Sequence, residues 1–497
     1  MTLMSTLARM EAVASGRAQP LTTVRHRHLA ERPLVLVPLT TAGEAGAPLG
    51  AMVGTDPERP RLLTVAQPRD RDLRFAFLAE LADAVLPHLE SARDEVEEEA
   101  GPCADVPQLL VPNSGGVEYV RLLGRSTRFR RSAEEDPEAA HPAPTPQWGS
   151  LPLLGRWLTH YGERARVPGS SLLLAMTEVL GRHWATGQSR LEDQHLGALL
   201  AWLRAPADGG GAAAAARAET ARDRAGLLCV PPAGPATDPA FDNRRLAPAI
   251  ERFDAKLPGA EEEIRTLIAS QLRPTWEAMW EGVELLRSLP PGARVAARWE
   301  GDRWSYTAHR DRLRAGEPPQ PRRDDAVTAA RKLATRERDQ ARLAAQEALD
   351  DPLVMAGRRL AGDAFAGEVV AVEMAYSAKG RPRPLVTVRT EDSPYLDAGT
   401  EVYRPLAGAR TPQKAEFVAS PGAGLLTVRL TSGMGSGKTA KPGTVPAEGD
   451  RLCWTLFEHA PRGRTGFPEP EDTPWTHGGP PALNATAPST VTSEDLP

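Results

Sequence analysis

The chain has 497 residues, enough for roughly two to four domains. It carries 65 Asp and Glu against 60 Lys and Arg, so no overall charge draws it toward nucleic acid. It has no apolar core of signal-peptide length and no run of about 18 apolar residues, so we expect no membrane segment. Cys103, Cys229 and Cys453 lie far apart, which excludes paired zinc spacing and predicts a reduced, cytoplasmic setting.

The N-terminal part, residues 1–130, has the pattern of an α+β domain. Asp70 caps a predicted helix whose apolar residues recur every four positions from Leu73 to Val85, which indicates one buried face. Before that helix, three apolar runs predict strands, at 33–39, 50–54 and 61–66.

Three short polar stretches in this part receive structural interpretations. Arg25 to His28 alternates arginine and histidine without a neighbouring acidic or cysteine ligand, so we interpret it as a solvated basic turn. The acidic run Glu95 to Glu99 is interpreted as a solvated helix end. Asn113 to Gly116 is interpreted as a turn, because it lacks the lysine and the following helix of a phosphate loop.

Composition and periodicity divide the rest of the chain. The predicted fold class is an α+β multidomain chain with an N-terminal α+β domain, a helical middle and a C-terminal small antiparallel β-barrel preceded by a long helix. The predicted segments are a linker at 131–147, a helical domain at 148–204, a Gly- and Ala-rich linker at 205–236, a helical segment with a β-hairpin at 237–323, a charged helix at 324–362, the barrel at 363–460 and a disordered tail at 461–497.

Two features of the helical middle resemble sites but favour structural roles. His183 and His195 flank a pair of acidic residues, yet they lie on different predicted helices, so we expect no metal there and no cofactor. Trp276 and Trp280 lie one helical turn apart, which favours a core pair over a base-stacking platform.

Residues 294–306 predict the hairpin. Val295 and Trp299 alternate with polar residues, a Glu-Gly-Asp turn follows, and two aromatics alternate back. Aromatics interleaved with arginine are typical of single-strand nucleic-acid binders, although an ordinary half-buried hairpin fits the same pattern. The candidate nucleic-acid-binding residues are Arg294, Arg298, Trp299, Arg303, Trp304 and Tyr306.

The last ordered part begins with a helix. Asp324 and Asp325 precede a run of good helix formers that extends to Asp351. Six alternating runs then predict short antiparallel strands, at 368–372, 385–389, 401–403, 415–418, 425–430 and 452–456.

This order of a helix and strands resembles the stalk helix and β-barrel of superfamily 1 helicases. The resemblance covers residues 324–457 and includes Leu385 to Val388, Ala398 to Val402 and Leu425 to Val428. In those helicases the barrel lies ahead of the motor and touches nucleic acid. No motor domain follows here, so the resemblance implies an accessory protein and not a helicase.

One stretch, Ser432 to Thr439, ends in the Gly-Lys-Thr of a phosphate-binding loop. It has serine where the motif needs its first glycine, and a proline-containing segment follows where the motif needs a helix. We therefore predict a glycine-rich hairpin loop between the last two strands and no nucleotide site. The residues of this degenerate loop are Gly433, Gly435, Gly437, Lys438 and Thr439.

No catalytic motif is present, which favours a protein that is not an enzyme without excluding one. The first hypothesis is a non-enzymatic accessory protein that binds single-stranded nucleic acid, or a helicase or ATPase partner, through the hairpin, the helix and the barrel. The alternative is a scaffold for protein assembly without nucleic-acid contact. A divergent enzyme is the third hypothesis.

Overall fold

The computed structural model describes residues 3–92, 101–104, 106–131, 135–138, 150–206, 209–321, 323–409, 411–460 and 466. The predicted acidic run, most of the predicted linker at 131–147 and nearly all of the predicted tail lie outside these residues. No helix in the described part is both long and apolar enough to cross a membrane.

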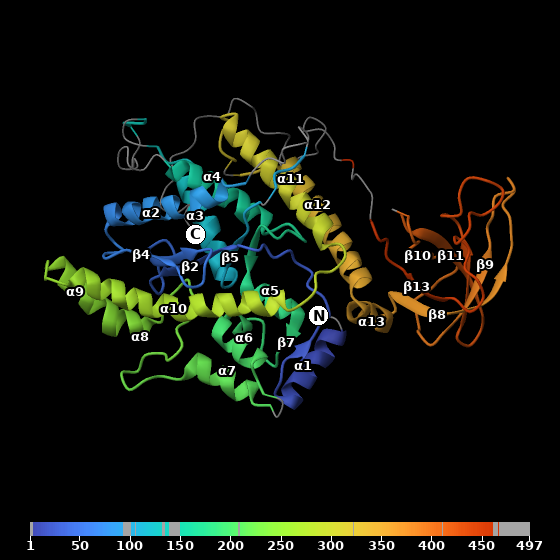
Figure 1. Ribbon diagram of the computed structural model, residues 1–497, viewed down its shortest axis with the longest axis horizontal. Coiled ribbons are helices and arrows are strands. Elements are labelled where there is room, and N and C mark those ends of the chain that lie inside the picture. Colours follow the sequence, from blue (N-terminus) through green and yellow to red (C-terminus); the bar gives the residue numbers. More distant parts are fainter. Residues whose placement is uncertain are drawn as a thin grey trace, which may run out of the picture.

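A five-stranded sheet forms the centre of the larger part of the molecule (Figure 1). Strands β2, β5 and β6 are parallel, whereas β2, β3 and β4 are antiparallel neighbours. The strand order is β4 (Arg61–Thr64), β3 (Pro48–Gly54), β2 (Leu34–Thr40), β5 (Leu109–Val111) and β6 (Leu173–Ala175).

Helices cover both faces of this sheet (Figure 1). All seven residues of β2 are buried, as expected for a strand with a near-continuous apolar sequence between two helical layers. One face packs against α2 (Arg71–Leu89), α3 (Ser114–Thr127) and α4 (Leu151–Arg164). The other packs against α5 (Met176–His183), α6 (Leu196–Leu203) and α10 (Ala260–Arg287), where Trp276 and Trp280 are core residues as predicted.

This arrangement corrects the predicted division of the chain. Strand β6 belongs to the predicted helical domain, yet it pairs with β5 of the predicted N-terminal domain, and α10 covers the same sheet. Residues from 1–130, 148–204 and 237–323 therefore share one core. The predicted linker at 205–236 contains α7 (Gly211–Thr220), which packs on α6 through Ala215 and Trp202. Smaller elements are α1 (Leu3–Ser15), β1 (Gln19–Pro20), β7 (Trp184–Ala185), η1 (Glu192–Gln194), α8 (Pro239–Phe241), η2 (Asp242–Leu246) and α9 (Ala247–Asp254).

The predicted hairpin is wrong, because residues Val295–Arg314 form a helix, α11. Its inward residues follow a spacing of three and four, which is helical, and two of them are polar. The short alternation near Trp299 concealed that period. The inward residues are Val295, Trp299, Asp302, Tyr306, His309 and Leu313.

The segment before the sheet is buried and not a solvated turn as predicted. His26 is 5% exposed and Arg27 is 6% exposed. Nearby, Thr23 donates to both carboxylate oxygens of Asp351, from its amide at 2.7 Å and from its hydroxyl at 3.0 Å. The N-terminal segment is therefore fastened to the junction of α12 (Ala326–Asp350) and α13 (Pro352–Leu360).

Helix α13 leads to the C-terminal β-domain, residues 364–455, at one end of the molecule (Figure 1). Its six antiparallel strands are ordered β10-β11-β12-β9-β8-β13, and β13 also pairs with β10, so the sheet closes on itself. Phe365 and Trp454 are fully buried inside. A mixed α and β chain with a six-stranded antiparallel C-terminal sheet is thus confirmed. The strands are β8 (Ala364–Glu373), β9 (Leu385–Thr390), β10 (Glu401–Arg404), β11 (Gln413–Gly422), β12 (Leu425–Leu430) and β13 (Arg451–Thr455).

Candidate nucleic-acid interface

The three arginines predicted to contact phosphates lie on α11 and are engaged within the protein. Arg294 forms an ion pair with the buried carboxylate of Asp350. Arg298 donates to the side-chain oxygen of Gln346 at 2.8 Å and to a backbone carbonyl at 2.9 Å. Arg303 donates to a backbone carbonyl at 2.7 Å. These guanidinium groups hold α11 against α12 and the N-terminal segments, so a phosphate would have to displace internal partners.

The predicted stacking rings are also mostly internal. Trp299 stacks on His28, with ring centroids 4.0 Å apart and an interplanar angle of 13°. Tyr306 is fully buried and its hydroxyl donates to the carbonyl of Leu89. Trp304 alone among the three presents its ring to solvent, at 46% exposed. The structure therefore does not bring the six candidate residues together on one open surface.

A basic surface instead lies at one end of the β-domain, where the topology brings two loops together. Strands β9 and β8 lie between β12 and β13, so the chain must pass the end of the β8–β9 hairpin on its way from β12 to β13. A methyl group added at Gly380 of the hairpin would lie 3.9 Å from the Cε atom of Lys438. The predicted hairpin loop is thus a crossover connection, because β12 and β13 are not paired.

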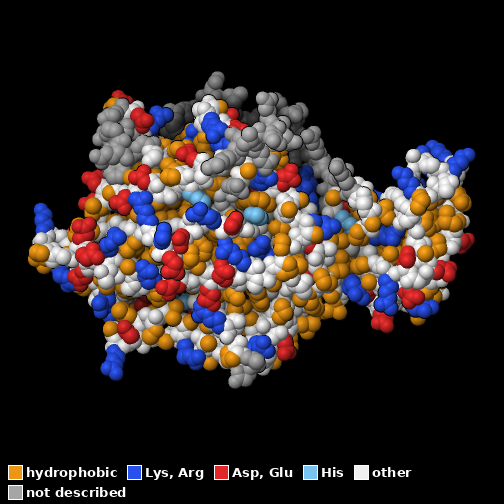
Figure 2. All heavy atoms as spheres, viewed as in Figure 1, with side chains coloured by type: hydrophobic (Ala, Val, Ile, Leu, Met, Phe, Trp, Pro, Cys, Tyr) orange, Lys and Arg blue, Asp and Glu red, His pale blue; other side chains and the backbone are white. Residues whose placement is uncertain are grey.

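We name this surface the basic tip. It carries no acidic residue, because the sequence has none from 374 to 390 or from 417 to 447. Figure 2 shows Lys and Arg side chains gathered at the upper end of the β-domain without Asp or Glu among them. All of the tip cations are exposed except one, which is half-buried. The basic tip consists of Lys379, Arg381, Arg383, Lys438 and Lys441.

The tip cations also differ from other cations of the β-domain in their partners. Lys414 pairs with Glu401 across two strands, and Arg429 lies 4.0 Å from Glu416. Within the described residues none of the five tip cations forms an ion pair with a carboxylate. Their charge is therefore available to an external anion.

Hydrogen bonds hold the hairpin side of the tip in shape. The amide of Gly380 donates to the carbonyl of Ser377 at 2.8 Å, which closes a turn, and Gly380 has a φ of 71° that favours glycine. The amide of Arg381 donates to the hydroxyl of Ser377 at 3.1 Å. Beside this turn the ring of Tyr376 is 59% exposed. An exposed ring next to unpaired cations is the combination that stacks a base and contacts phosphate.

The glycine-rich side of the tip is anchored by Met434 to the core of the β-domain. Met434 is 3% exposed and belongs to the core of the β-domain, and its carbonyl accepts from the amide of Lys441 at 3.0 Å. The Lys441 side chain lies across Gly435, whose added methyl group would meet it at 3.2 Å. No helix begins after Thr439 in the described residues, so the loop lacks the helix N-terminus that cradles phosphates in a nucleotide site.

No protein family, curated protein or solved structure matches this chain. Within the described part of the chain, no group of three or more His, Cys, Asp and Glu is arranged to hold a metal ion. His183 instead contacts the carbonyl of Val179 at 2.7 Å, and His195 accepts from the amide of Ala198 at 3.2 Å. The assignment of the basic tip as a candidate site therefore depends on its geometry and charge alone.

Sequence reasoning missed the basic tip although its signal was present. The absence of acidic residues from both loops is visible in the sequence, but the two loops are about 55 positions apart. Only the strand order makes them neighbours. A count of charge by loop instead of by helix would have identified Arg381 and Lys438 as candidates.

Proposed function

We propose that this protein is a non-enzymatic accessory protein that binds single-stranded nucleic acid through the basic tip. One observation carries the proposal. Five cations without an ion pair in the described part of the chain and the exposed ring of Tyr376 lie together where two loops of the β-domain meet. In the proposed complex the cations contact phosphate oxygens and the ring stacks on a base. The proposed binding surface is therefore the β-domain, as the sequence suggested, and not the residues of α11.

Binding of this kind depends on local charge. The whole chain has a net charge of −5, so attraction acts at the tip and not across the molecule. Lysine and arginine contacts to phosphate carry no sequence information, so the proposed binding is tolerant of base sequence. Stacking on Tyr376 is tolerant as well, because every base presents a flat face.

The resemblance of residues 324–457 to the stalk and barrel of superfamily 1 helicases is a separate ground for the proposal. In those helicases the barrel touches nucleic acid, and the basic tip lies on two loops of the β-domain to which the resemblance extends. We propose on this ground that the partner on the same strand is a helicase or ATPase motor. The alternative, a protein-assembly scaffold, needs none of the tip cations.

The test is a salt titration of single-stranded DNA and RNA binding by the full chain. Counterion release predicts that the logarithm of affinity falls linearly with the logarithm of salt, with a slope of about −0.7 per phosphate contact. Lys438→Ala with Lys441→Ala should therefore make the slope shallower by about 1.4. Tyr376→Ala should cost roughly 1–3 kcal/mol at every salt concentration.

A matched control lies in the same domain. Lys414 is a lysine of the β-domain outside the tip and pairs with Glu401, so Lys414→Ala should leave the slope unchanged. Absence of binding at about 50 mM salt by the folded chain would remove the nucleic-acid proposal and leave the scaffold. An equal change of slope in the control and the tip variant would show that binding is not located at the tip.

A further inference from the structure

A cavity of about 350 Å³ lies beside β6, the edge strand of the central sheet. Its walls come from α3, the loop at 165–170, β6, α5 and the N-terminal segment, and one residue of α12 completes them. A cavity of this size is at the lower end of the range that small-molecule sites occupy. It shares no residue with the β-domain or the basic tip.

Three arginines line this cavity: Arg27, Arg166 and Arg182. Arg166 and Arg182 are exposed, whereas Arg27 is only 6% exposed, so the first two lie at the rim and the third lies inside. The Nη1 atom of Arg27 is buried without a hydrogen-bond partner. Among the described residues none of the three forms an ion pair.

The backbone on either side of Arg27 is held by specific contacts. The amide of His26 donates to Nε2 of His183 at 3.3 Å, and its carbonyl accepts from Arg298 at 2.9 Å. The amide of His28 donates to the hydroxyl of Ser171 at 3.1 Å. Arg298, predicted to bind nucleic acid, thus positions the segment that carries Arg27.

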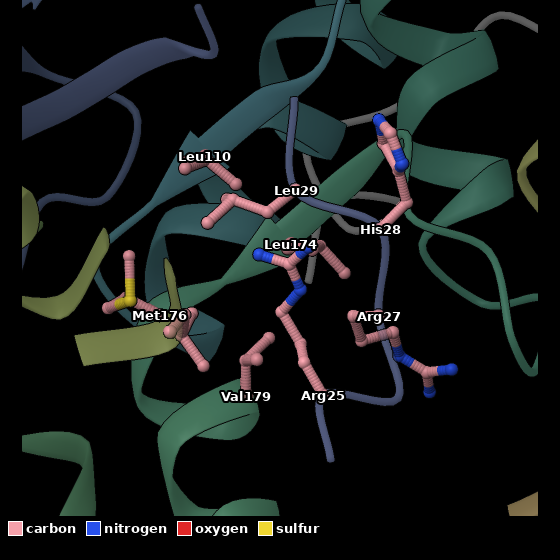
Figure 3. Close-up of a pocket in the computed structure, with 9 residues that line it drawn as sticks. Arg25, Arg27, His28, Leu29, Leu110, Leu174, Met176 and Val179 are labelled. Carbon is pink, nitrogen blue, oxygen red and sulfur yellow. The ribbon is translucent and has the colours of Figure 1, made fainter. Parts of the chain in front are cut away.

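Figure 3 shows the directions that the side chains of this segment take. Arg25 extends among apolar side chains that include Leu110 and Leu174, where a small cavity of about 10 Å³ remains. Arg27 extends away from Arg25. Both arginines line the small cavity, and of the two only Arg27 also lines the larger one.

The loop at 165–170 is also fixed from behind. Asp302 of α11 is fully buried and accepts from Arg164 at 2.6 Å, from the Ser170 hydroxyl at 2.7 Å and from the Ser171 amide at 2.6 Å. Gly169 within the loop has a φ of 90°, and a methyl group added there would lie 4.0 Å from Nη1 of Arg27. The hydrogen bonds of Asp302 thus fix the loop that faces Arg27.

Electrostatics leave the cavity short of negative charge. Burial lowers the pKa of Arg27 to about 10, with Arg182 lowering it further and Glu347 opposing, so the guanidinium remains charged at pH 7. Two glutamates line the cavity against three arginines; Glu118 pairs with Arg121, which leaves Glu178, an acceptor from the neutral amide of Gln194 at 3.0 Å, as the one carboxylate of the described lining without an ion pair. A buried cation without a partner is costly, and a bound anion removes that cost.

We propose that this cavity is a binding site for a small phosphorylated molecule, whose phosphate is held by Arg27, Arg166 and Arg182. Arginine presents a planar fork of donors that matches phosphate oxygens, and three arginines balance a phosphate dianion better than they balance a single carboxylate. The remaining wall includes Val117 and Leu173, which suit an apolar or ring-shaped body attached to the phosphate. This site is independent of the basic tip.

The test uses the full chain and inorganic phosphate as the probe. Thermal unfolding is followed with increasing phosphate and, in a parallel arm, with chloride at equal ionic strength. Phosphate should raise Tm by about 2 °C or more at saturation, because a ligand that binds only the folded state stabilises it. Arg166→Ala with Arg182→Ala should abolish the difference between phosphate and chloride.

Arg27→Met distinguishes a ligand site from a structural arginine. Methionine removes the unpaired buried charge at similar length, so this variant should match or exceed the wild-type Tm without phosphate and should not respond to phosphate. Arg265→Ala, at an exposed position of α10, should keep the full response. A lower Tm of Arg27→Met that phosphate still raises, or no difference between phosphate and chloride in wild type, would overturn the proposal. A response to succinate without one to phosphate would overturn the phosphate assignment.

Discussion

The imidazole rings of His160 on α4 and His309 on α11 stack with centroids 4.2 Å apart and an interplanar angle of 3°. Both side chains are buried, and Nε2 of each ring has no hydrogen-bond partner. Arg156, Arg164 and Arg312 surround the pair with positive charge. Two parallel rings in this setting are stable only when both are neutral.

The pair predicts a loss of stability in acid. Burial and the neighbouring arginines lower the pKa of His309 from 6.5 to about 3, and burial lowers the pKa of His160 as well. The unfolded chain therefore binds protons below pH 6.5 that the folded chain does not, so stability is complete above pH 6.5 and is lost as pH falls toward 3. Each histidine contributes a slope of about 1.4 kcal/mol per pH unit.

Urea unfolding of His309→Gln between pH 7 and 5 measures this contribution. The slope of the unfolding free energy against pH should decrease by up to about 1.4 kcal/mol per unit, and His160→Gln with His309→Gln should decrease it about twice as much. All eight described histidines have a lowered pKa for which burial is the largest cause, so a residual slope should remain. An unchanged slope in the double variant would contradict the neutral pair.

Replacement of Asp302 by asparagine should be strongly destabilising. The change leaves the half-buried Arg164 beside a neutral amide and removes a charged acceptor from two further donors. We expect a cost of about 3–5 kcal/mol in the free energy of unfolding, measured in urea. Asp311→Asn on the same helix is the control, because that carboxylate is 57% exposed and should cost less than about 1 kcal/mol.

Two helical glycines should respond to alanine with opposite signs. A methyl group at Gly155 of α4 would lie 2.3 Å from the Arg128 backbone nitrogen, where the end of α3 approaches closely. Gly155→Ala should therefore cost about 1–3 kcal/mol or more by overpacking. A methyl group at Gly181 of α5 meets no atom within 4 Å, so Gly181→Ala should stabilise the protein by up to about 1 kcal/mol. Thermal unfolding of both variants checks the pair, and equal shifts would contradict the close helix contact.

The Gly-Lys-Thr loop should not bind nucleotide. Lys438 is exposed at the basic tip and no described helix follows it, so Lys438→Ala should leave Mg-ATP binding at the same negligible level as wild type. Isothermal calorimetry is the measurement. Micromolar affinity that disappears in the variant would show that the loop holds a nucleotide after all.

The sequence predicted those parts of the fold whose signals are local. The alternation from 368 to 456 identified the strands of the β-domain, and the one-turn spacing of Trp276 and Trp280 identified a core pair. The helix α11 was missed because the buried positions include Asp302 and His309. A search for apolar residues at helical spacing does not detect a helix face that buries polar side chains, because distant partners satisfy those side chains.

The site needed information that no local pattern holds. Gly380 and Lys438 become neighbours through the strand order, and Arg27 meets Arg182 because the N-terminal segment contacts the end of α5 through His26 and His183. The turn predicted at Asn113 to Gly116 was wrong for a local reason: Asn113 caps α3, and two glycines near its start hid the helix that follows. Both surfaces depend on pairings between segments far apart in the chain.

The hydrogen bonds between Thr23 and Asp351 can form only late in synthesis. The two residues are 328 positions apart, and a ribosome adds about 5–20 residues per second, so the N-terminal segment waits roughly 15–65 s for its partner to emerge. During that interval the nascent chain can form the strands of the central sheet and the contacts of His26 and His28, but Thr23 has no partner. Any chain released before residue 351 lacks both hydrogen bonds of Thr23 and keeps only the contacts that His183, Ser171 and Arg298 make further along the segment.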